Sequence, residues 1–140
     1  MHLPRLTHLA IHVTDIDACV EFYQRYCGME ICHQRQSNSQ QIIWMAEPGR
    51  ESDFIFVVMS GGCDLQLSGN DYRHFGFAVE SKAAVDNLAE LARERGDLVW
   101  EPRDEPYPVG YYCGLRDPNG NFVEFSYGQP LGPGANELPK

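Results

Sequence analysis

The sequence lacks the features of several large protein classes. Positive charge is scarce, since 11 Lys and Arg stand against 20 Asp and Glu, and the resulting net charge of −9 argues against nucleic acid or an anionic membrane as the main partner. No apolar run has the length of a transmembrane helix. The opening residues Met1–Arg5 contain no apolar segment of the kind found in signal peptides. We therefore expect a cytoplasmic protein with no nucleic-acid or membrane partner.

Paired cysteines are missing as well. The chain has five cysteines, an odd number, and none of them forms a C-x-x-C motif; they are Cys19, Cys27, Cys32, Cys63 and Cys113. This pattern favours reduced thiols over a disulfide framework. We expect most of them to be small buried hydrophobic residues.

What the chain does contain is an internal repeat. The pattern His8-x-Ala10-x-His12-Val13 returns as His74-x-Gly76-x-Ala78-Val79, an offset of 66 residues (74 − 8). Both stretches alternate as strands do. Each is followed by a predicted helix with a capping residue before it, Asp15 or Asp17 in one case and Ser81 in the other, and with Gly28 or Gly96 after it. The two halves of the chain are therefore predicted to have the same local fold.

Each repeat is predicted to be a strand, a helix and then about three strands. The modules cover about residues 5–69 and 70–128, and neither could bury both faces of its sheet alone. We expect an α+β fold in which two tandem βαβββ modules form one curved, barrel-like mixed sheet within a single domain, residues 1–128. A strand at 98–101 should end at a proline-rich loop, and the tail 129–140 should be extended or mobile.

The clearest local pattern is a hairpin over residues 110–127. Asp117-Pro118-Asn119-Gly120 predicts a tight turn, because Pro118 fixes φ at the second position and Gly120 tolerates positive φ. In the strand that follows, alternation places Glu124 on one face with Phe122 and Ser126. A carboxylate within an apolar strand is costly unless another group is paired with it.

Three polar residues in this framework suggest a metal site. His8 and His74 occupy the same phase of the two opening strands, next to the small residues Ala10 and Gly76, and Glu124 lies in the closing strand. Two imidazoles and one carboxylate with open coordination positions suit a catalytic divalent metal. Spacing alone leaves other interpretations open: each His could be hydrogen-bonded, and Glu124 could pair with Arg116 or Arg103 or face solvent.

Other candidates are weaker. His12 shares the face of His8, whereas His2 and His33 are interpreted as surface residues. Tyr111, Tyr112 and Arg116 are candidate pocket groups. Trp44, Trp100 and Tyr107 could line a pocket, but ordinary core packing is the preferred interpretation.

Together these elements resemble the vicinal oxygen chelate superfamily, which includes glyoxalase I, extradiol ring-cleaving dioxygenases, fosfomycin-resistance thiol transferases, methylmalonyl-CoA epimerase and bleomycin-resistance proteins. The resemblance covers nearly the whole chain except the tail. The residues that carry it are Leu6–Val13 with Phe22, Tyr23 and Gly28, then His74–Val79, and finally Asp117–Glu124.

The resemblance implies a metal-dependent enzyme that binds a small substrate through vicinal oxygens, with dioxygenase-like or glyoxalase-like (lyase or isomerase) chemistry. By position, the implied metal ligands are His8, His74 and Glu124, and Glu124 and Tyr112 are the candidate catalytic residues. The metal could be Fe²⁺, Mn²⁺, Zn²⁺ or Ni²⁺. Because relatives often take the first ligand from one chain and the other two from a second, the resemblance also implies a homodimer with a shared site.

At two positions this chain differs from the patterns of glyoxalase I and the extradiol dioxygenases, and these differences narrow the range of reactions expected of it. Glyoxalase I has a further Glu in the fourth strand of its first module, and here the matching position, most closely Val57, is apolar; Gln66 is the nearest other oxygen ligand. The extradiol pattern has a Tyr three residues before Asp-Pro, where this chain has Gly114, and a further His that residues 75–140 do not supply.

Two other functions compete with the enzyme. A metal-free small-molecule binder like the bleomycin-resistance proteins fits the acidic net charge of −9 but not the complete His-His-Glu set. A purely structural module predicts neither a cavity nor a metal.

Overall fold

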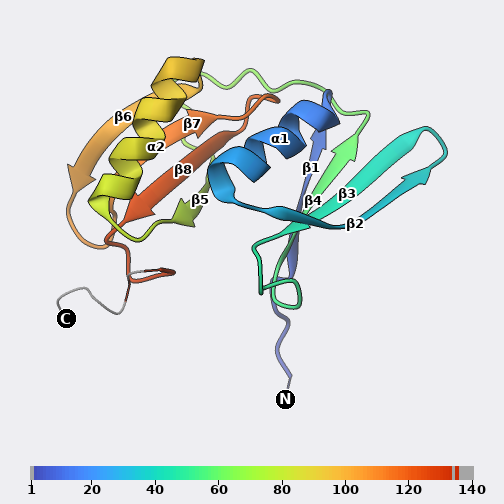
Figure 1. Cartoon of the computed structure of the whole chain (residues 1–140), viewed down its shortest axis with the longest axis horizontal. Helices are drawn as coiled ribbons and strands as arrows, with labels where there is room; N and C mark the ends of the chain where they lie inside the picture. Colours follow the sequence, from blue (N-terminus) through green and yellow to red (C-terminus); the bar gives the residue numbers. More distant parts are fainter. Residues whose placement is uncertain (1, 134, 136–140) are drawn as a thin grey trace. The chain divides into compact units, whose positions relative to one another are not determined.

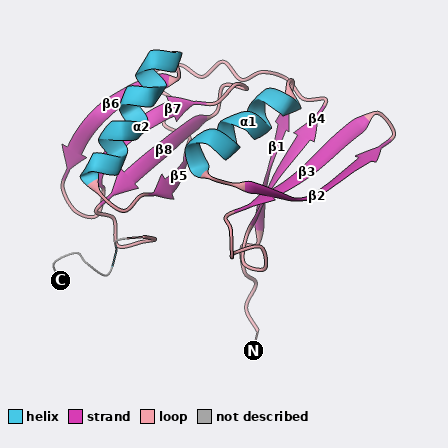
Figure 2. Ribbon diagram, viewed as in Figure 1, coloured by secondary structure: helices cyan, strands magenta, loops and turns pink. Residues whose placement is uncertain are grey.

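A computed structural model describes residues 2–133 and 135 of the chain. This part of the chain contains two helices and eight strands, the predicted α+β composition (Figures 1 and 2). It divides into two compact units, residues 1–65 and 66–140, which are described separately. Neither helix of the described part is long and apolar enough to cross a membrane.

The first unit is a four-stranded mixed sheet with one helix. Its elements are β1 (His8–Val13), α1 (Ile16–Cys27), β2 (Glu30–Ser37), β3 (Gln40–Ala46) and β4 (Ile55–Ser60). The strand order is β1-β4-β3-β2, and β1 and β4 run parallel while the other pairs are antiparallel. The first strand therefore pairs with the last, so the two strands farthest apart in the sequence of the unit are neighbours in its sheet.

The second unit repeats this order. Its elements are β5 (Phe75–Ala78), α2 (Lys82–Arg95), β6 (Leu98–Glu105), β7 (Gly110–Arg116) and β8 (Phe122–Tyr127). The sheet order is β5-β8-β7-β6, again with the first and last strands parallel. In Figure 1, α2 crosses the strands against which it packs, β6, β7 and β8. The predicted βαβββ repeat is confirmed in both units.

The predicted helix ends are also confirmed. The side chain of Asp15 accepts a hydrogen bond from the Ala18 amide, and the side chain of Ser81 accepts one from the Ala84 amide, so each satisfies a donor of the first turn. Gly28 and Gly96 end the helices in the left-handed region, with φ of 63° and 79°. A side chain at either position would be strained, which explains why glycine occurs at both.

In each unit the helix covers one face of the sheet, and the other face is on the side away from the helix. In β1 the residues Ile11 and Val13 are buried while His8, Ala10 and His12 are exposed, as the alternation predicted. The ring centroids of Tyr23 on α1 and Phe56 on β4 lie 4.6 Å apart, which shows the side of the sheet that α1 covers. The histidines of β1 are therefore on the opposite side of the sheet from α1.

The strand predicted at 98–101 is wrong in length, because β6 continues through Pro102 to Glu105. A proline has no amide to donate to a sheet, but β6 is an edge strand and its register with β7 shifts between Trp100 and Arg103. Prolines are tolerated at edges and bulges of this kind. The extra length brings Arg103 opposite Tyr112.

Two other expectations concern the cysteines. Cys19 and Cys113 are buried, but Cys27 is half-buried and Cys32 and Cys63 are exposed, so the expectation that most cysteines are buried is wrong. All five are free thiols, as predicted.

The tail beyond β8 is described as far as residue 133 and at residue 135. In that part Gly132 lies so close to β5 that a Cβ on it would be 2.6 Å from the Cβ of Ala78. The rest of the predicted extended tail lies outside the described residues.

Candidate metal and substrate site

Two of the three predicted ligands meet in the second sheet. β5 and β8 are parallel neighbours, and Gly76 pairs with Glu124 in register. His74 immediately precedes β5, so its side chain lies on the same face as Gly76. Residues 50 positions apart (124 − 74) are thereby brought together, with 3.8 Å between His74 Nε2 and Glu124 Oε1.

A hydrogen bond to the backbone orients the ring of His74. Its Nδ1 lies 2.6 Å from the carbonyl oxygen of Tyr72. A carbonyl oxygen only accepts, so Nδ1 carries the proton and donates it. In the neutral ring the lone pair is then on Nε2, the nitrogen that faces Glu124. Metal-binding imidazoles are commonly held in this way, with the other ring nitrogen donating to a carbonyl or carboxylate.

Glu124 is buried, with 9% of its surface exposed, and its two oxygens have different neighbours. Oε1 faces His74, while Oε2 accepts a weak hydrogen bond of 3.5 Å from the side-chain amide of Gln129. Burial raises the pKa of Glu124, and the charge of His74 and the hydrogen bond from Gln129 oppose that rise. The carboxylate is therefore poorly solvated and only partly compensated by protein groups.

The alternative partners considered for Glu124 are engaged elsewhere. Arg116 lies over the ring of Phe122, with its guanidinium carbon 5.3 Å from the centroid. Arg103 forms an ion pair with Glu105, with 3.2 Å from Nε to Oε1. Glu124 therefore depends on His74 and Gln129, not on an arginine.

A cavity of about 380 Å³ opens beside the His74–Glu124 pair. This volume is within the range of small-molecule sites. Four aromatic or imidazole rings and one proline supply much of its wall, and the full lining is Tyr72, His74, Trp100, Glu101, Pro102, Arg103, Tyr112 and Glu124. The structural-module interpretation, which predicts no cavity, does not account for it.

The sequence distinguished poorly between the aromatic candidates. Tyr112 lines the cavity as predicted, but Tyr111 points to the opposite face, where its hydroxyl donates to Asp86 on α2 at 2.5 Å. The preference for core packing was wrong for all three residues to which it applied: the Trp100 indole is part of the cavity wall, while Trp44 and Tyr107 are exposed. Gly114 is paired with Trp100 in the sheet, but the sequence does not show this pairing, because the strand register shifts on both sides of Trp100.

The chemistry of the pair fits a divalent metal. One imidazole nitrogen and one carboxylate oxygen are typical ligands, and two ligands at about 2.0–2.2 Å from one ion can span the 3.8 Å between them. Within residues 2–133 and 135, no group of three or more His, Cys, Asp or Glu side chains is close enough to hold a metal. His74 and Glu124 are thus two of the ligands that such a site would use.

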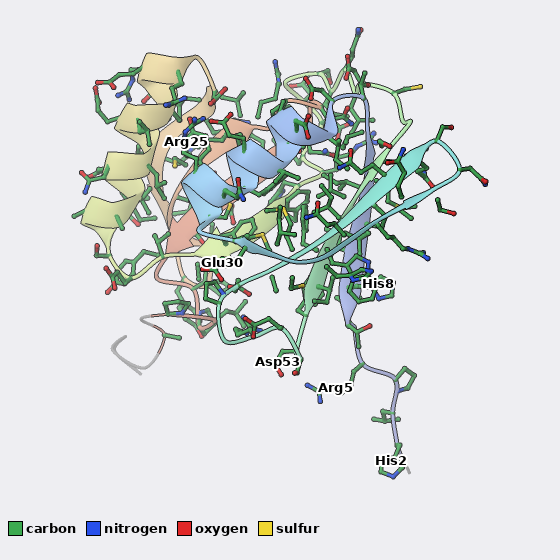
Figure 3. The ribbon with its side chains drawn as sticks, turned by 45° about the vertical axis from the view of Figure 1, so that its right-hand side comes forward. His2, Arg5, His8, Arg25, Glu30 and Asp53 are labelled. Atoms are coloured by element: carbon green, nitrogen blue, oxygen red, sulfur yellow. The ribbon has the colours of Figure 1, made fainter. Side chains whose placement is uncertain are left out.

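His8, the third predicted ligand, lies in the first unit. It begins β1 opposite Ile55, its side chain is exposed, and its Nδ1 lies 3.0 Å from the hydroxyl of Thr7. Figure 3 shows His8 on β1, with His2 and Arg5 on the segment that precedes the strand. The three-residue ligand set remains a prediction.

The other histidines are as expected. His2 and His33 are exposed. His12 is also exposed, and its Nε2 lies 3.1 Å from the carbonyl oxygen of Ser60.

The strand registers identify the residue that corresponds to Glu124 in the first unit. Gly76 pairs with Glu124 in the second unit, and its repeat equivalent Ala10 pairs with Val57 in the first. Val57 is thus the counterpart of Glu124 in the first unit, and it is apolar. Gln66 lies beyond the end of β4.

The two sheets also differ in which strand places an indole near Val57 or near Glu124. In the first unit Trp44 pairs with Val57 and its ring lies 5.5 Å from that of His33. In the second unit the equivalent of Trp44 is Gly114, and the indole comes instead from Trp100 on the neighbouring strand. The space over Gly114, which has no side chain, is occupied by the Trp100 indole.

Comparison with known proteins gives a consistent assignment. Residues 5–125 match the family model described as the Glyoxalase/Bleomycin resistance protein/Dioxygenase superfamily. An uncharacterised protein of Pseudomonas aeruginosa is 65% identical over 136 residues, which are 97% of this chain and 97% of that protein. A lactoylglutathione lyase of Neisseria meningitidis is 24% identical over 124 residues, 86% of this chain and 88% of that protein. A probable trivalent organoarsenical cleaving enzyme of Bacillus subtilis is 24% identical over 125 residues, 88% of this chain and 80% of that protein.

Solved structures share the fold. A glyoxylase/bleomycin resistance protein/dioxygenase domain from Frankia superposes with a TM-score of 0.72 at 21% identity, covering 91% of this chain and 100% of that chain. A mutant of the fosfomycin resistance protein FosX from Listeria monocytogenes, complexed with Mn(II) and 1S,2S-dihydroxypropylphosphonic acid, gives a TM-score of 0.73 at 20% identity, covering 91% of this chain and 93% of that chain.

Proposed function

The chain belongs to the Glyoxalase/Bleomycin resistance protein/Dioxygenase superfamily, and on this premise we propose that it is a metal-dependent enzyme acting on a small substrate bound through two vicinal oxygens. The observation that carries the proposal is the His74–Glu124 pair. A buried carboxylate faces an imidazole nitrogen at 3.8 Å, the imidazole is fixed by the Tyr72 carbonyl, and a cavity of about 380 Å³ adjoins both. Such an arrangement is costly for a purely structural role.

In this proposal His74 Nε2 and Glu124 Oε1 hold the metal together with His8. The bound ion would supply Lewis-acid polarisation of the substrate oxygens. Metal binding would also offset the electrostatic cost of the buried carboxylate, which otherwise raises the pKa of Glu124. The donor set is compatible with Fe²⁺, Mn²⁺, Zn²⁺ or Ni²⁺.

The other residues of the cavity bind and orient the substrate. Tyr112 lies two residues before Gly114 on β7 and lines the cavity with Glu124, so its hydroxyl is a candidate to donate a hydrogen bond to a substrate oxygen on which charge develops. Trp100 and Pro102 contribute apolar wall that excludes water from the reacting atoms.

Val57 limits the reaction class. A glyoxalase-type proton shuttle has one more carboxylate at this position, and Val57 can neither bind a metal nor accept a proton. The names of the relatives, which include a lactoylglutathione lyase and an organoarsenical cleaving enzyme, favour lyase chemistry, while open positions on an Fe²⁺ ion would also admit dioxygen.

Substrate assays on protein treated with chelator and reloaded with each of the four metals test this function. Restored activity on a hemithioacetal identifies a lyase or isomerase, and restored oxygen uptake with a catechol identifies a dioxygenase. Activity that survives complete metal removal would refute the metal-dependent enzyme. Tight binding of bleomycin by metal-free protein would instead favour the competing drug-binding function, which the net charge of −9 suits.

We also propose a homodimer in which His8 of one protomer completes the site formed by His74 and Glu124 of the other. The proposal follows from the resemblance to relatives that take the first ligand from one chain and the other two from a second. Mixing and refolding the His8→Ala and Glu124→Gln variants tests this proposal. A shared site predicts that mixed dimers regain one intact site of every two, because both changes fall in the same site. A site within one chain predicts no recovery.

A further inference from the structure

Trp100 lies directly on the backbone of the neighbouring strand. A Cβ built on Gly114 would be 2.1 Å from Cε3 and 2.5 Å from Cδ2 of the indole, far inside van der Waals contact. No residue other than glycine fits at position 114 while the indole keeps this place. The absence of a side chain at Gly114 is therefore what allows Trp100 to occupy this position.

Two further rings hold the indole in its orientation. The ring of Phe122 lies 5.2 Å from it at an interplanar angle of 54°, and the ring of His74 lies 5.7 Å away at 90°. Both are arrangements that favour aromatic pairs. Trp100 is nevertheless only half-buried, and it lines the cavity beside Tyr112 and Tyr72. A rigid, partly exposed indole thus stands next to the predicted ligand His74.

The charged residues of the cavity are already engaged with other groups. The carboxylate of Glu101 forms an ion pair with Arg93 of α2, with 2.5 Å from a guanidinium nitrogen to Oε2. Arg103 is paired with Glu105 at 3.2 Å. Glu101 and Arg103 thus each have an ionic partner that is not part of the cavity lining, whereas Trp100, Tyr112 and Tyr72 line the cavity.

We propose that Trp100, seated on Gly114, is a specificity-determining residue that selects substrates with a flat, conjugated ring attached to the metal-binding oxygens. This inference rests on the proposed function, because the oxygens of the substrate are placed by the His74–Glu124 site. A planar ring makes contacts with the indole and with the two tyrosine rings. A puckered saturated ring of similar size cannot make the same contacts.

The test compares two 2-hydroxy acids that chelate through the same oxygens. Mandelate carries a phenyl ring and hexahydromandelate a cyclohexyl ring. Each is titrated into Zn²⁺-loaded and into metal-free protein, and binding is followed by tryptophan fluorescence. The chain has two tryptophans, so a Trp44→Phe background leaves Trp100 as the reporter. Isothermal titration calorimetry provides the same constants for variants without Trp100.

We expect mandelate to bind roughly tenfold more tightly than hexahydromandelate. Trp100→Leu should bring this ratio close to one while zinc content stays unchanged, and Trp100→Phe should retain most of the preference. Gly114→Ala, which displaces the indole, should lower the ratio in the same direction. The Trp44→Phe control should leave it unaltered.

Two results would overturn the proposal: equal affinity for the two acids in the unsubstituted protein, or an unchanged ratio in Trp100→Leu protein of normal zinc content. Failure of the proposed function is distinguishable, because it appears as missing zinc in the unsubstituted protein. In that case the titrations of metal-free protein still measure the ring preference directly.

Discussion

Replacing Gly76 with alanine should weaken metal binding without weakening the fold. Gly76 lies in β5 opposite Glu124, and a Cβ there would be 3.2 Å from Oε2 and 3.7 Å from Cβ of Glu124. Ordinary contact begins at 3.4 Å, so the carboxylate would have to move by at least 0.2 Å (3.4 − 3.2). Moving Oε2 rotates the whole carboxylate and with it Oε1, the oxygen that faces His74.

Gly76→Ala should act in opposite directions on the stability of the fold and on the affinity for metal. Glycine within a strand is about 0.5–1 kcal/mol less favourable than alanine, and Gly76 has no positive φ that would strain an alanine. The free energy of unfolding of metal-free protein should therefore stay the same or rise slightly. Metal affinity should fall by about 10- to 100-fold, the range seen when groups that orient a ligand are altered.

The assay is a Zn²⁺ titration by calorimetry together with urea unfolding of the metal-free protein. Gly69→Ala is the matched control, because a Cβ at Gly69 meets nothing within 4 Å and its φ is ordinary. Unchanged zinc affinity in the Gly76→Ala protein would refute the assignment of Glu124 as a ligand. A loss of stability equal to the loss of affinity would show that the change acts through the fold instead.

Three further predictions concern the surroundings of the site. Burial raises the pKa of the Glu124 carboxyl group in the folded protein. As pH increases, the unfolded chain therefore loses the carboxyl proton before the folded protein does, and the free energy of unfolding falls between the ordinary and the raised pKa. In chelator-treated protein, the stability gain of Glu124→Gln in urea unfolding should be close to zero below about pH 4 and grow toward neutral pH; a gain that is independent of pH would contradict it. Gln129→Ala should lower zinc affinity by about tenfold, because Oε2 loses its hydrogen bond, with no change in the circular dichroism spectrum; full affinity would exclude Gln129 from positioning the carboxylate. Burial, with nearby carboxylates, raises the pKa of Cys113 to about 12, so Ellman's reagent should react with the exposed Cys32 and Cys63 and not with Cys113 until the protein unfolds; fast labelling of Cys113 in native protein would contradict the described packing.

The fold was predictable because each local signal agreed with the repeat. The alternation around His8 and His74 defines the opening strands, and the glycines at 28 and 96 stop both helices in the left-handed region. The length of β6 was not predictable, because a proline usually interrupts a strand, and only the sheet order shows that this strand is at an edge with a bulge. Local sequence does not reveal where a strand lies within its sheet.

The site was predictable only in part. His74 and Glu124 could be identified because strand phase places them on one face and the family resemblance relates them. The roles of Trp100 and Gln129 depend on contacts that sequence periodicity does not describe. The Trp100 indole lies on Gly114 of the neighbouring strand, and the side-chain amide of Gln129, beyond the end of β8, donates to Glu124. A glycine opposite a tryptophan becomes informative only when the register between the two strands is known.

The central claim is that His74 and Glu124 hold a divalent metal ion. The most direct measurement is the metal content of protein purified without chelator, compared among the unsubstituted chain, His74→Ala and Glu124→Gln, with His33→Ala as a control for an exposed histidine outside the site. We predict about one metal ion per chain in the unsubstituted protein and in the control, and little or none in the two site variants. Equal metal content in all four proteins, or no metal in any of them after supplying each candidate ion, would contradict the claim.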